Sequence, residues 1–430
     1  MLREGVEVLR HVAVFDGHLP PGLAFIRQLG AFGVPVTVFS PRRLPAGRFS
    51  RFKHAFQRCP DPAATDEFTD WLTEEMRAGR VDLVAPTSDA VAFCVAEARD
   101  RLPADTAPPG PSRDVIYSVL FKHRFGDAMG RLGFPAPPSA APVTPDGYRE
   151  FARQTGFPLV LKPRSHVGVG ANRGSVVRDH AELEAAIVPF SIPPGNDTVL
   201  REDPDLRWPL IQRYIDTDTS DIVSVSGCLA GDGTLLAVGH SRKTEMWPPQ
   251  VGVGTEFEWL DSQPFTEQAV SAVRSVIGSG LFELEVCHDR ATGQSWPIDL
   301  NPRGYGQMSL DIANGNDLPT IWYRSITNQP PAAATAATQP ETSARTWRLA
   351  LPFYVGRIAG IVQGPQRWHA TRTFVRNLGS RPAGAVAQHN DPLPAIVYSL
   401  SFLRHPWGLV RPFVEAGRHP RSSGRTPQAT

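Results

Sequence analysis

Short apolar runs alternate with amphipathic stretches along the first 115 residues. The apolar runs have the length and composition of buried strands and fall at 11–15, 34–39 and 81–85. Between them, the stretches 23–29 and 68–76 space their apolar residues along one face of a helix. Strands that alternate with helices form a parallel sheet with right-handed crossovers. We therefore predict an α/β domain over residues 1–115.

Polar residues follow two of these strands. Asp16 and Gly17 end the first run, and Thr87, Ser88 and Asp89 follow the third. Open α/β sheets bind ligands at the carboxyl ends of their strands, so both loops are candidate binding segments. The first loop lacks GxGxxG, which argues against a nicotinamide or flavin dinucleotide site.

A different pattern begins after the helical stretch 112–132, which Gly133-Phe134-Pro135 ends. Residues 145–330 combine the helical stretches 146–154 and 265–277 with successive strands bounded by turn residues. The strands are expected at 159–162, 176–177, 210–215, 222–229, 235–239, 281–286 and 296–300. This succession predicts an α+β region.

Composition divides the last hundred residues. Residues 329–346 are rich in Pro, Ala and Thr and are predicted to be a linker. Residues 347–417 contain enough aromatic side chains for an ordered C-terminal extension, whereas the polar, basic tail 418–430 is predicted to be disordered.

Composition and charge exclude several classes of protein. The 430 residues include 44 Lys and Arg against 43 Asp and Glu, a net charge of +1, so no global field attracts nucleic acid. No run approaches the roughly 20 apolar residues of a membrane span, and the first ten residues lack a signal-peptide core. The four cysteines are scattered, without a CxxC pair. We expect a cytoplasmic protein with no membrane span and no nucleic-acid partner.

A glycine-containing loop follows the strand 159–162. That strand ends at Lys162, Pro163 stops further pairing, and the loop contains Gly168 and Gly170. Glycines let backbone N–H groups approach phosphate oxygens, and a lysine adds positive charge. The common alternative is an ordinary hairpin with a solvated lysine. The segment is not a P-loop, because GxxxxGK[ST] occurs nowhere in the chain.

Acidic residues gather on a second predicted hairpin. Glu283 and Glu285 share one face of the strand 281–286, and Asp299 and Asn301 share one face of its partner. Carboxylate and amide oxygens of this kind bind Mg²⁺, which completes its shell with water and phosphate oxygens. Arg303 could reach an anion bound by that metal. The alternative is a solvated acidic face, and Glu283 fits either interpretation.

These segments, in this order, resemble the ATP-grasp superfamily of carboxylate–amine ligases over residues 10–330. The stretches VAPTSD, SVLFK with GFPAPP, LIQRYI, HSRKT and DLNPRG carry the resemblance. It implies an α/β pre-ATP-grasp domain followed by an α+β ATP-grasp fold that holds ATP between two lobes. By this resemblance 1–115 is the pre-ATP-grasp domain, 116–208 the first lobe and 209–328 the second.

The resemblance also implies roles for individual residues. ATP would be bound by Lys122, Lys162, Gly168, Gly170, Gln212, Arg213, Ile215 and Asp221, with Asp221 at the ribose. The metal ligands would be Glu285, Asp299 and Asn301, and the catalytic cations Arg242, Lys243 and Arg303. The sequence departs from the family pattern at Gln212 and Asp299, where Glu is usual, and at His166, where small residues are common.

The implied reaction activates a carboxylate as an acyl phosphate with MgATP, or with Mn²⁺ as the metal, and joins it to an amine. The partners would be small-molecule carboxylates and amines, with a homodimer as a candidate assembly. D-aspartate ligase-like and carbamoyl-phosphate-synthase-like single-chain members resemble the chain most. The alternatives are a carboxylate kinase, a bicarbonate-dependent N-carboxylase, and an inactive nucleotide-binding regulator.

Overall fold

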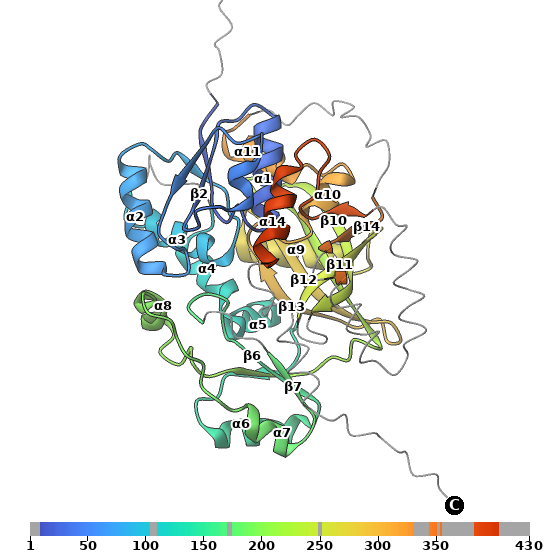
Figure 1. Ribbon diagram of the computed structural model, residues 1–430. Coiled ribbons are helices and arrows are strands. Elements are labelled where there is room, and N and C mark those ends of the chain that lie inside the picture. The colour runs from blue at the N-terminus through green and yellow to red at the C-terminus, as the bar shows by residue number, and fades with distance from the viewer. Residues whose placement is uncertain are drawn as a thin grey trace, which may run out of the picture.

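The computed structural model describes residues 9–103, 110–169, 174–247, 252–329, 344–350, 353–354 and 382–403. Three sheets organise this part of the chain: a four-stranded N-terminal sheet, a small four-stranded sheet, and a seven-stranded sheet. Figure 1 shows the small sheet, with its helices, projecting below the other two. No helix in the described residues is long and apolar enough to cross a membrane.

The N-terminal sheet is parallel, as the alternating pattern predicts. Its strand order is β3-β2-β1-β4, with β1 at Val12–Val14, β2 at Val36–Ser40, β3 at Ala55–Arg58 and β4 at Leu83–Val84. The helices of this region are α1 (Pro20–Ala31), α2 (Thr65–Arg77) and α3 (Asp89–Arg99), with a 3₁₀ turn, η1, at Ala46–Phe49. The sequence pattern missed β3, because this edge strand reads Ala-Phe-Gln-Arg and is half exposed.

The predicted helix 112–132 is two helices. α4 spans Arg113–Leu120, α5 spans Lys122–Arg131, and Phe121 between them has an extended ψ of 106°. Lys122 is therefore the first residue of a helix, where the chain turns toward the sheets. Its backbone N–H donates to the Arg164 carbonyl at 2.8 Å, which ties this turn to the loop after Lys162.

The small sheet has the order β5-β8-β6-β7. Its strands are β5 (Ser139–Ala140), β6 (Leu159–Lys162), β7 (Ser175–Val177) and β8 (Leu210–Arg213), and its helices are α6 (Pro145–Thr155), α7 (His180–Ala186) and α8 (Asp197–Glu202). A separate core around Tyr148 and Leu159 holds it together. Because β8 pairs with β6, the strand at the predicted start of the second lobe belongs to the small sheet.

The large sheet has the order β13-β12-β9-β10-β11-β14-β15. Its strands are β9 (Ser220–Leu229), β10 (Leu235–Trp247), β11 (Val253–Leu260), β12 (Gly280–Asp289), β13 (Ser295–Asn301), β14 (Thr346–Arg348) and β15 (Ala383–Gly384). Helix α9 (Thr266–Ile277) packs its apolar side against Val223 and Val225 of β9. Helices α10 (Met308–Ala313) and α11 (Leu318–Ile326) pack with Cys228 and Leu281, which point to the other face.

The C-terminal extension joins the large sheet to the N-terminal domain. β14 pairs with β11, and α14 (Leu393–Leu403) packs against η1, which in turn contacts α1. Before α14, the buried Asp391 accepts hydrogen bonds from Arg27 Nε at 2.9 Å and Ser50 Oγ at 2.8 Å. Most of the predicted linker and the whole predicted tail 418–430 lie outside the described residues.

Candidate functional site

A cavity of about 430 Å³ lies between the small sheet and the large sheet. We call it the intersheet cavity. Strands β6 and β8 supply one wall, and β10, β12 and β13 supply the other. Of the predicted site residues, the lining includes Lys122, Lys162, Gln212, Arg213, Ile215, Lys243, Glu285 and Asp299.

Two carboxylates face each other across the β12–β13 hairpin. Glu285 is paired with Asp299 in the antiparallel register, and each carboxylate has a lysine partner. Lys243 Nζ lies 2.6 Å from Glu285 Oε1, and Lys122 Nζ is ion-paired with Asp299 Oδ1. Burial alone would raise the pKa of Asp299, but Lys122 and His166 hold it well below its usual range. Asp299 is therefore charged, and each of the two carboxylates has an ion-pair partner within the protein.

Lys162 differs from the other two lysines. It ends β6 inside the cavity, and no carboxylate of the described residues lies within ion-pair distance of its ammonium group. Burial and the neighbouring charge of Lys122 lower the pKa of Lys162 to about 8. An unpaired cation in a confined space is a site for a ligand anion.

The part of the intersheet cavity beside the end of β8 is suited to a flat ring. Chain direction changes after β8, where the Tyr214 N–H donates to the Pro158 carbonyl at 3.2 Å. The Ile215 N–H has no partner among the described residues, and Gln212 is buried. The apolar lining here consists of Val160, Ile222, Met246 and Ile298. A free backbone donor beside apolar walls fits the edge and faces of a purine.

Beyond the carboxylates, Arg303 is held by the N-terminal domain. Its Nε and Nη2 donate to the two oxygens of Asp89 at 2.7 and 2.8 Å, and Nη2 also donates to Asn301 Oδ1 at 2.8 Å. Burial would raise the pKa of Asp89, but the charge and hydrogen bonds of Arg303 lower it. No pattern in the sequence assigns a partner to Asp89; its only signal is its place after a strand of the N-terminal sheet.

Glu283 is buried rather than solvated. Its oxygens accept hydrogen bonds from Ser224 Oγ at 2.8 Å, from Asn301 Nδ2 at 3.3 Å and from Gln307 Nε2. Burial and the nearby Glu285 raise the pKa of Glu283 to about 7. With Arg303 and Asp89, these side chains form a polar network that continues from the intersheet cavity to the N-terminal domain.

Arg242 and Asp221 do not point into the cavity, in contrast to their predicted roles. Neighbouring strand residues face opposite sides of a sheet, so Lys243 points into the cavity and Arg242 away from it. Arg242 Nη2 instead lies 2.6 Å from Glu258, and Nη1 lies 3.6 Å from Asp221. Asp221 also pairs with Arg290 at 2.8 Å. These side chains form an ion-pair network on the opposite face of the large sheet.

The predicted glycine loop is only partly described. Gly168 has a φ of +79°, and a Cβ there would lie 3.1 Å from Val199 and 3.2 Å from Leu206. Close packing therefore accounts for glycine at 168, which does not line the cavity. Gly174, which sequence reasoning missed, does line it, and Gly170 lies outside the described residues.

The donor set fits a divalent cation only with help from a ligand. Nowhere in the described part of the chain do three His, Cys, Asp or Glu side chains form a group that could hold a metal. Glu285 and Asp299 supply two facing carboxylates, while the Asn301 oxygen accepts from Arg303. Mg²⁺ commonly takes one or two carboxylates and completes its shell with water and nucleotide phosphates. This pair of carboxylates meets that requirement.

Sequence comparison finds distant relatives. No protein-family model matches the chain. The carbamoyl phosphate synthase large chain of Thermus thermophilus is 25% identical over 196 residues, which are 45% of this chain and 18% of that protein. The match thus spans less than a fifth of the curated relative.

Structure comparison covers more of the chain. The biotin carboxylase of Campylobacter jejuni has a TM-score of 0.58 and 15% identity, over 74% of this chain and 71% of that one. An L-amino acid ligase from Bacillus licheniformis has a TM-score of 0.54 and 15% identity, over 78% of each chain. At such identities the likeness shows a shared fold.

Proposed function

Because the chain has the ATP-grasp fold, we propose that it is an ADP-forming carboxylate–amine ligase. In this reaction a carboxylate oxygen attacks the γ-phosphorus of ATP, the bond to the β–γ bridging oxygen breaks, and ADP leaves. The amine nitrogen then attacks the acyl carbon, phosphate leaves, and the amine loses a proton. The products are ADP, phosphate and an amide. An amino acid or a small peptide is the proposed substrate class.

The observation that carries this proposal is the charge arrangement of the intersheet cavity. Lys162 has no carboxylate partner, whereas Lys122 and Lys243 each neutralise a carboxylate. A magnesium–nucleotide complex would supply phosphate oxygens to Lys162, and it could replace the two internal ion pairs by offering phosphate oxygens to the other lysines and a cation to Glu285 and Asp299. Such an exchange leaves no buried charge without a partner, which is the condition for stable charges in a cavity.

Positioning and charge neutralisation are the main tasks of the protein in phosphoryl transfer. Lys122, Lys162 and Lys243 would bind phosphate oxygens. Glu285 and Asp299, with Asn301 as a third ligand, would hold Mg²⁺, which neutralises phosphate charge when bound. Purine contacts would come from Gln212 and from the backbone of Arg213 and Ile215.

Arg303 is the proposed contact for the substrate carboxylate or its acyl phosphate. Asp89, Asn301 and the Gly304 carbonyl engage four of the five N–H donors of its guanidinium, so one Nη1 N–H is left for such a group. Asp89 already uses two of its donors, which fixes the plane of the guanidinium and leaves fewer rotations to restrict on binding. Asp89 is therefore a proposed positioning residue.

One alternative has a specific observation in its favour. The fold is similar to that of a biotin carboxylase, and this similarity favours an N-carboxylase, in which ATP phosphorylates bicarbonate instead of an organic carboxylate. The two functions differ in their requirement for bicarbonate. Carboxylate-dependent ADP release in degassed, bicarbonate-free buffer supports the amide ligase, whereas release that needs added bicarbonate supports the N-carboxylase.

The test is a screen of amino acids and small peptides for ADP and phosphate release by the purified protein. We expect ADP formation that requires both a carboxylate and an amine. ADP formation that no amine stimulates would refute the ligase assignment.

Asp299→Asn tests the site itself. It should lower kcat by at least about 100-fold, because it removes one of two facing carboxylates, and Asp261→Asn, an exposed carboxylate outside the cavity, should leave kcat unchanged. Circular dichroism and melting temperature would verify that both variants are folded. Unchanged kcat in a folded Asp299→Asn variant would contradict the metal assignment.

A further inference from the structure

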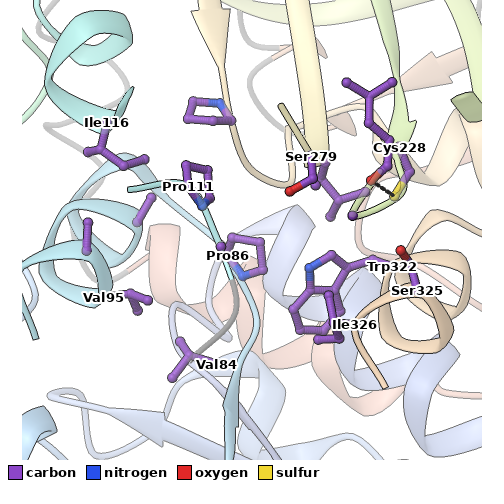
Figure 2. A pocket seen from close by; sticks show the side chains of 18 of the residues that line it. Val84, Pro86, Val95, Pro111, Ile116, Cys228, Ser279, Trp322, Ser325 and Ile326 are labelled. Carbon is purple, nitrogen blue, oxygen red and sulfur yellow. Dashed lines mark hydrogen bonds between the residues drawn. The ribbon is translucent and has the colours of Figure 1, made fainter. Parts of the chain in front are cut away.

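A second cavity lies between the N-terminal domain and the large sheet. Its volume is about 160 Å³, and it shares no lining residue with the intersheet cavity. Helix α3 and the start of α4 line one side, and α11 with the ends of β9 and β12 line the other (Figure 2). We call it the interdomain cavity.

Its walls are predominantly apolar. Val84, Ala92, Val95, Ile116, Leu281 and Ile326 contribute hydrocarbon side chains. A cavity of about 150 Å³ is large enough to bind a molecule the size of benzene. The interdomain cavity therefore has room for one aromatic ring or one branched alkyl group.

Three side chains of the lining carry donor groups that have no partner among the described residues. The Trp322 indole N–H has no hydrogen-bond partner among the described residues, and Figure 2 shows its nitrogen facing the space beside Pro86. The hydroxyl groups of Ser279 and Ser325 also lack partners in the described part of the chain. A buried tryptophan N–H usually donates to an acceptor. A ligand with an acceptor group could provide the one that is missing here.

Arg99 adds a positive charge to these donors. One of its guanidinium nitrogens donates to the Gly110 carbonyl, and no carboxylate of the described residues pairs with it. Among the residues that the structure describes, the lining contains no aspartate or glutamate. Apolar walls with one cation and several neutral donors are complementary to a small molecule with an apolar body and one carboxylate.

We propose that the interdomain cavity binds a small monocarboxylate with an aromatic or branched apolar body. Its body would fill the space between α3 and α11, and its carboxylate would accept from Arg99 and from the unpartnered donors. This site is distinct from the proposed nucleotide site and does not depend on the proposed ligase activity.

The position of the cavity connects it with the polar network around Arg303. Pro86 and Pro302 line it, and the Pro86 carbonyl accepts from the Gly304 N–H at 2.7 Å. Asp89 begins α3, the same helix that lines the cavity. A ligand between these elements would stabilise the contact between the two domains, so binding should raise the melting temperature of the full chain.

Benzoate and its neutral counterpart benzamide are suitable probes, with melting temperature and calorimetric titration as readouts. We expect benzoate to raise the melting temperature and to bind about tenfold more tightly than benzamide, the usual worth of one charge-assisted hydrogen bond. Arg99→Gln should abolish this preference. Arg101→Gln, at the same end of α3 but paired with Asp70 outside the cavity, should retain it.

Filling the cavity gives a second, independent test. Ala96 lines it from α3 and is buried, so Ala96→Leu should occupy the space and abolish binding of both probes. Arg99→Gln changes a half-buried side chain at the helix end, so it tests the charge even if the filling variant does not fold. The proposal is overturned if benzoate does not bind the wild-type chain, if Ala96→Leu still binds it, or if Arg99→Gln keeps the preference.

Discussion

Nucleotide binding should weaken as the pH rises above 8, because of one lysine. Lys162 has its pKa lowered to about 8 by burial and by Lys122, so the empty cavity loses this charge in mildly alkaline solution. A bound phosphate group would restore a normal, higher pKa. Binding above pH 8 must therefore be accompanied by uptake of a proton.

The size of the effect follows from this pKa. At pH 7 about nine-tenths of the Lys162 side chains are protonated, and at pH 9 about one-tenth are, so the dissociation constant for MgADP should increase about tenfold.

The lowered pKa of Lys162 also affects the stability of the fold. The unfolded chain binds more protons than the native state between pH 8 and about 10.5, so Lys162 makes the free energy of unfolding rise with pH in that window.

Calorimetric titration of MgADP at pH 7 and pH 9 measures this dependence, and buffers of different ionisation enthalpy measure the proton uptake. Lys162→Arg keeps a positive charge at both values of pH and should remove most of the dependence. Equal pH dependence in wild type and Lys162→Arg, or no dependence in the wild type, would refute the reasoning.

Three further substitutions, one of them a control, test the packing that positions the sites. Asp391→Ala should lower the free energy of unfolding in urea by about 3–5 kcal/mol, because it leaves the buried Arg27 charge unpaired; a loss below 1 kcal/mol would contradict this anchoring. Gly239→Ala should cost about 3 kcal/mol, since its Cβ would lie 2.0 Å from Asp311 Oδ1. Gly130→Ala, in an open position of α5, should instead stabilise by about 0.5–1 kcal/mol, and equal effects of the two glycine substitutions would contradict the close-contact argument.

Local periodicity was sufficient to predict the carboxylate pair. Glu285 and Asp299 lie on strands joined by a short turn, and the two-residue repeat of a strand determines which side chains share a face. The parallel N-terminal sheet was predictable for a similar reason, because its central strands are short apolar runs between helices. Such features depend on residues close together in the sequence.

Features that depend on long-range register were not predictable. Arg242 and Lys243 are adjacent and equally basic, and only the alignment of β10 with β9 and β11 decides which one faces the cavity. A shift by one residue would exchange them. The contact between Arg303 and Asp89 joins residues 214 positions apart, so no local pattern could reveal it.

The net charge of +1 hides a local excess that the structure makes visible. Within the described part of the chain, the lining of the intersheet cavity includes four cationic side chains, Lys122, Lys162, Arg213 and Lys243, and two carboxylates, Glu285 and Asp299. This excess suits a magnesium–nucleotide complex, which is a net anion. The interdomain cavity also has a positive excess, because its described lining includes Arg99 and no acidic residue. Because opposite charges elsewhere balance both sites, the total charge of the chain carries no information about either one.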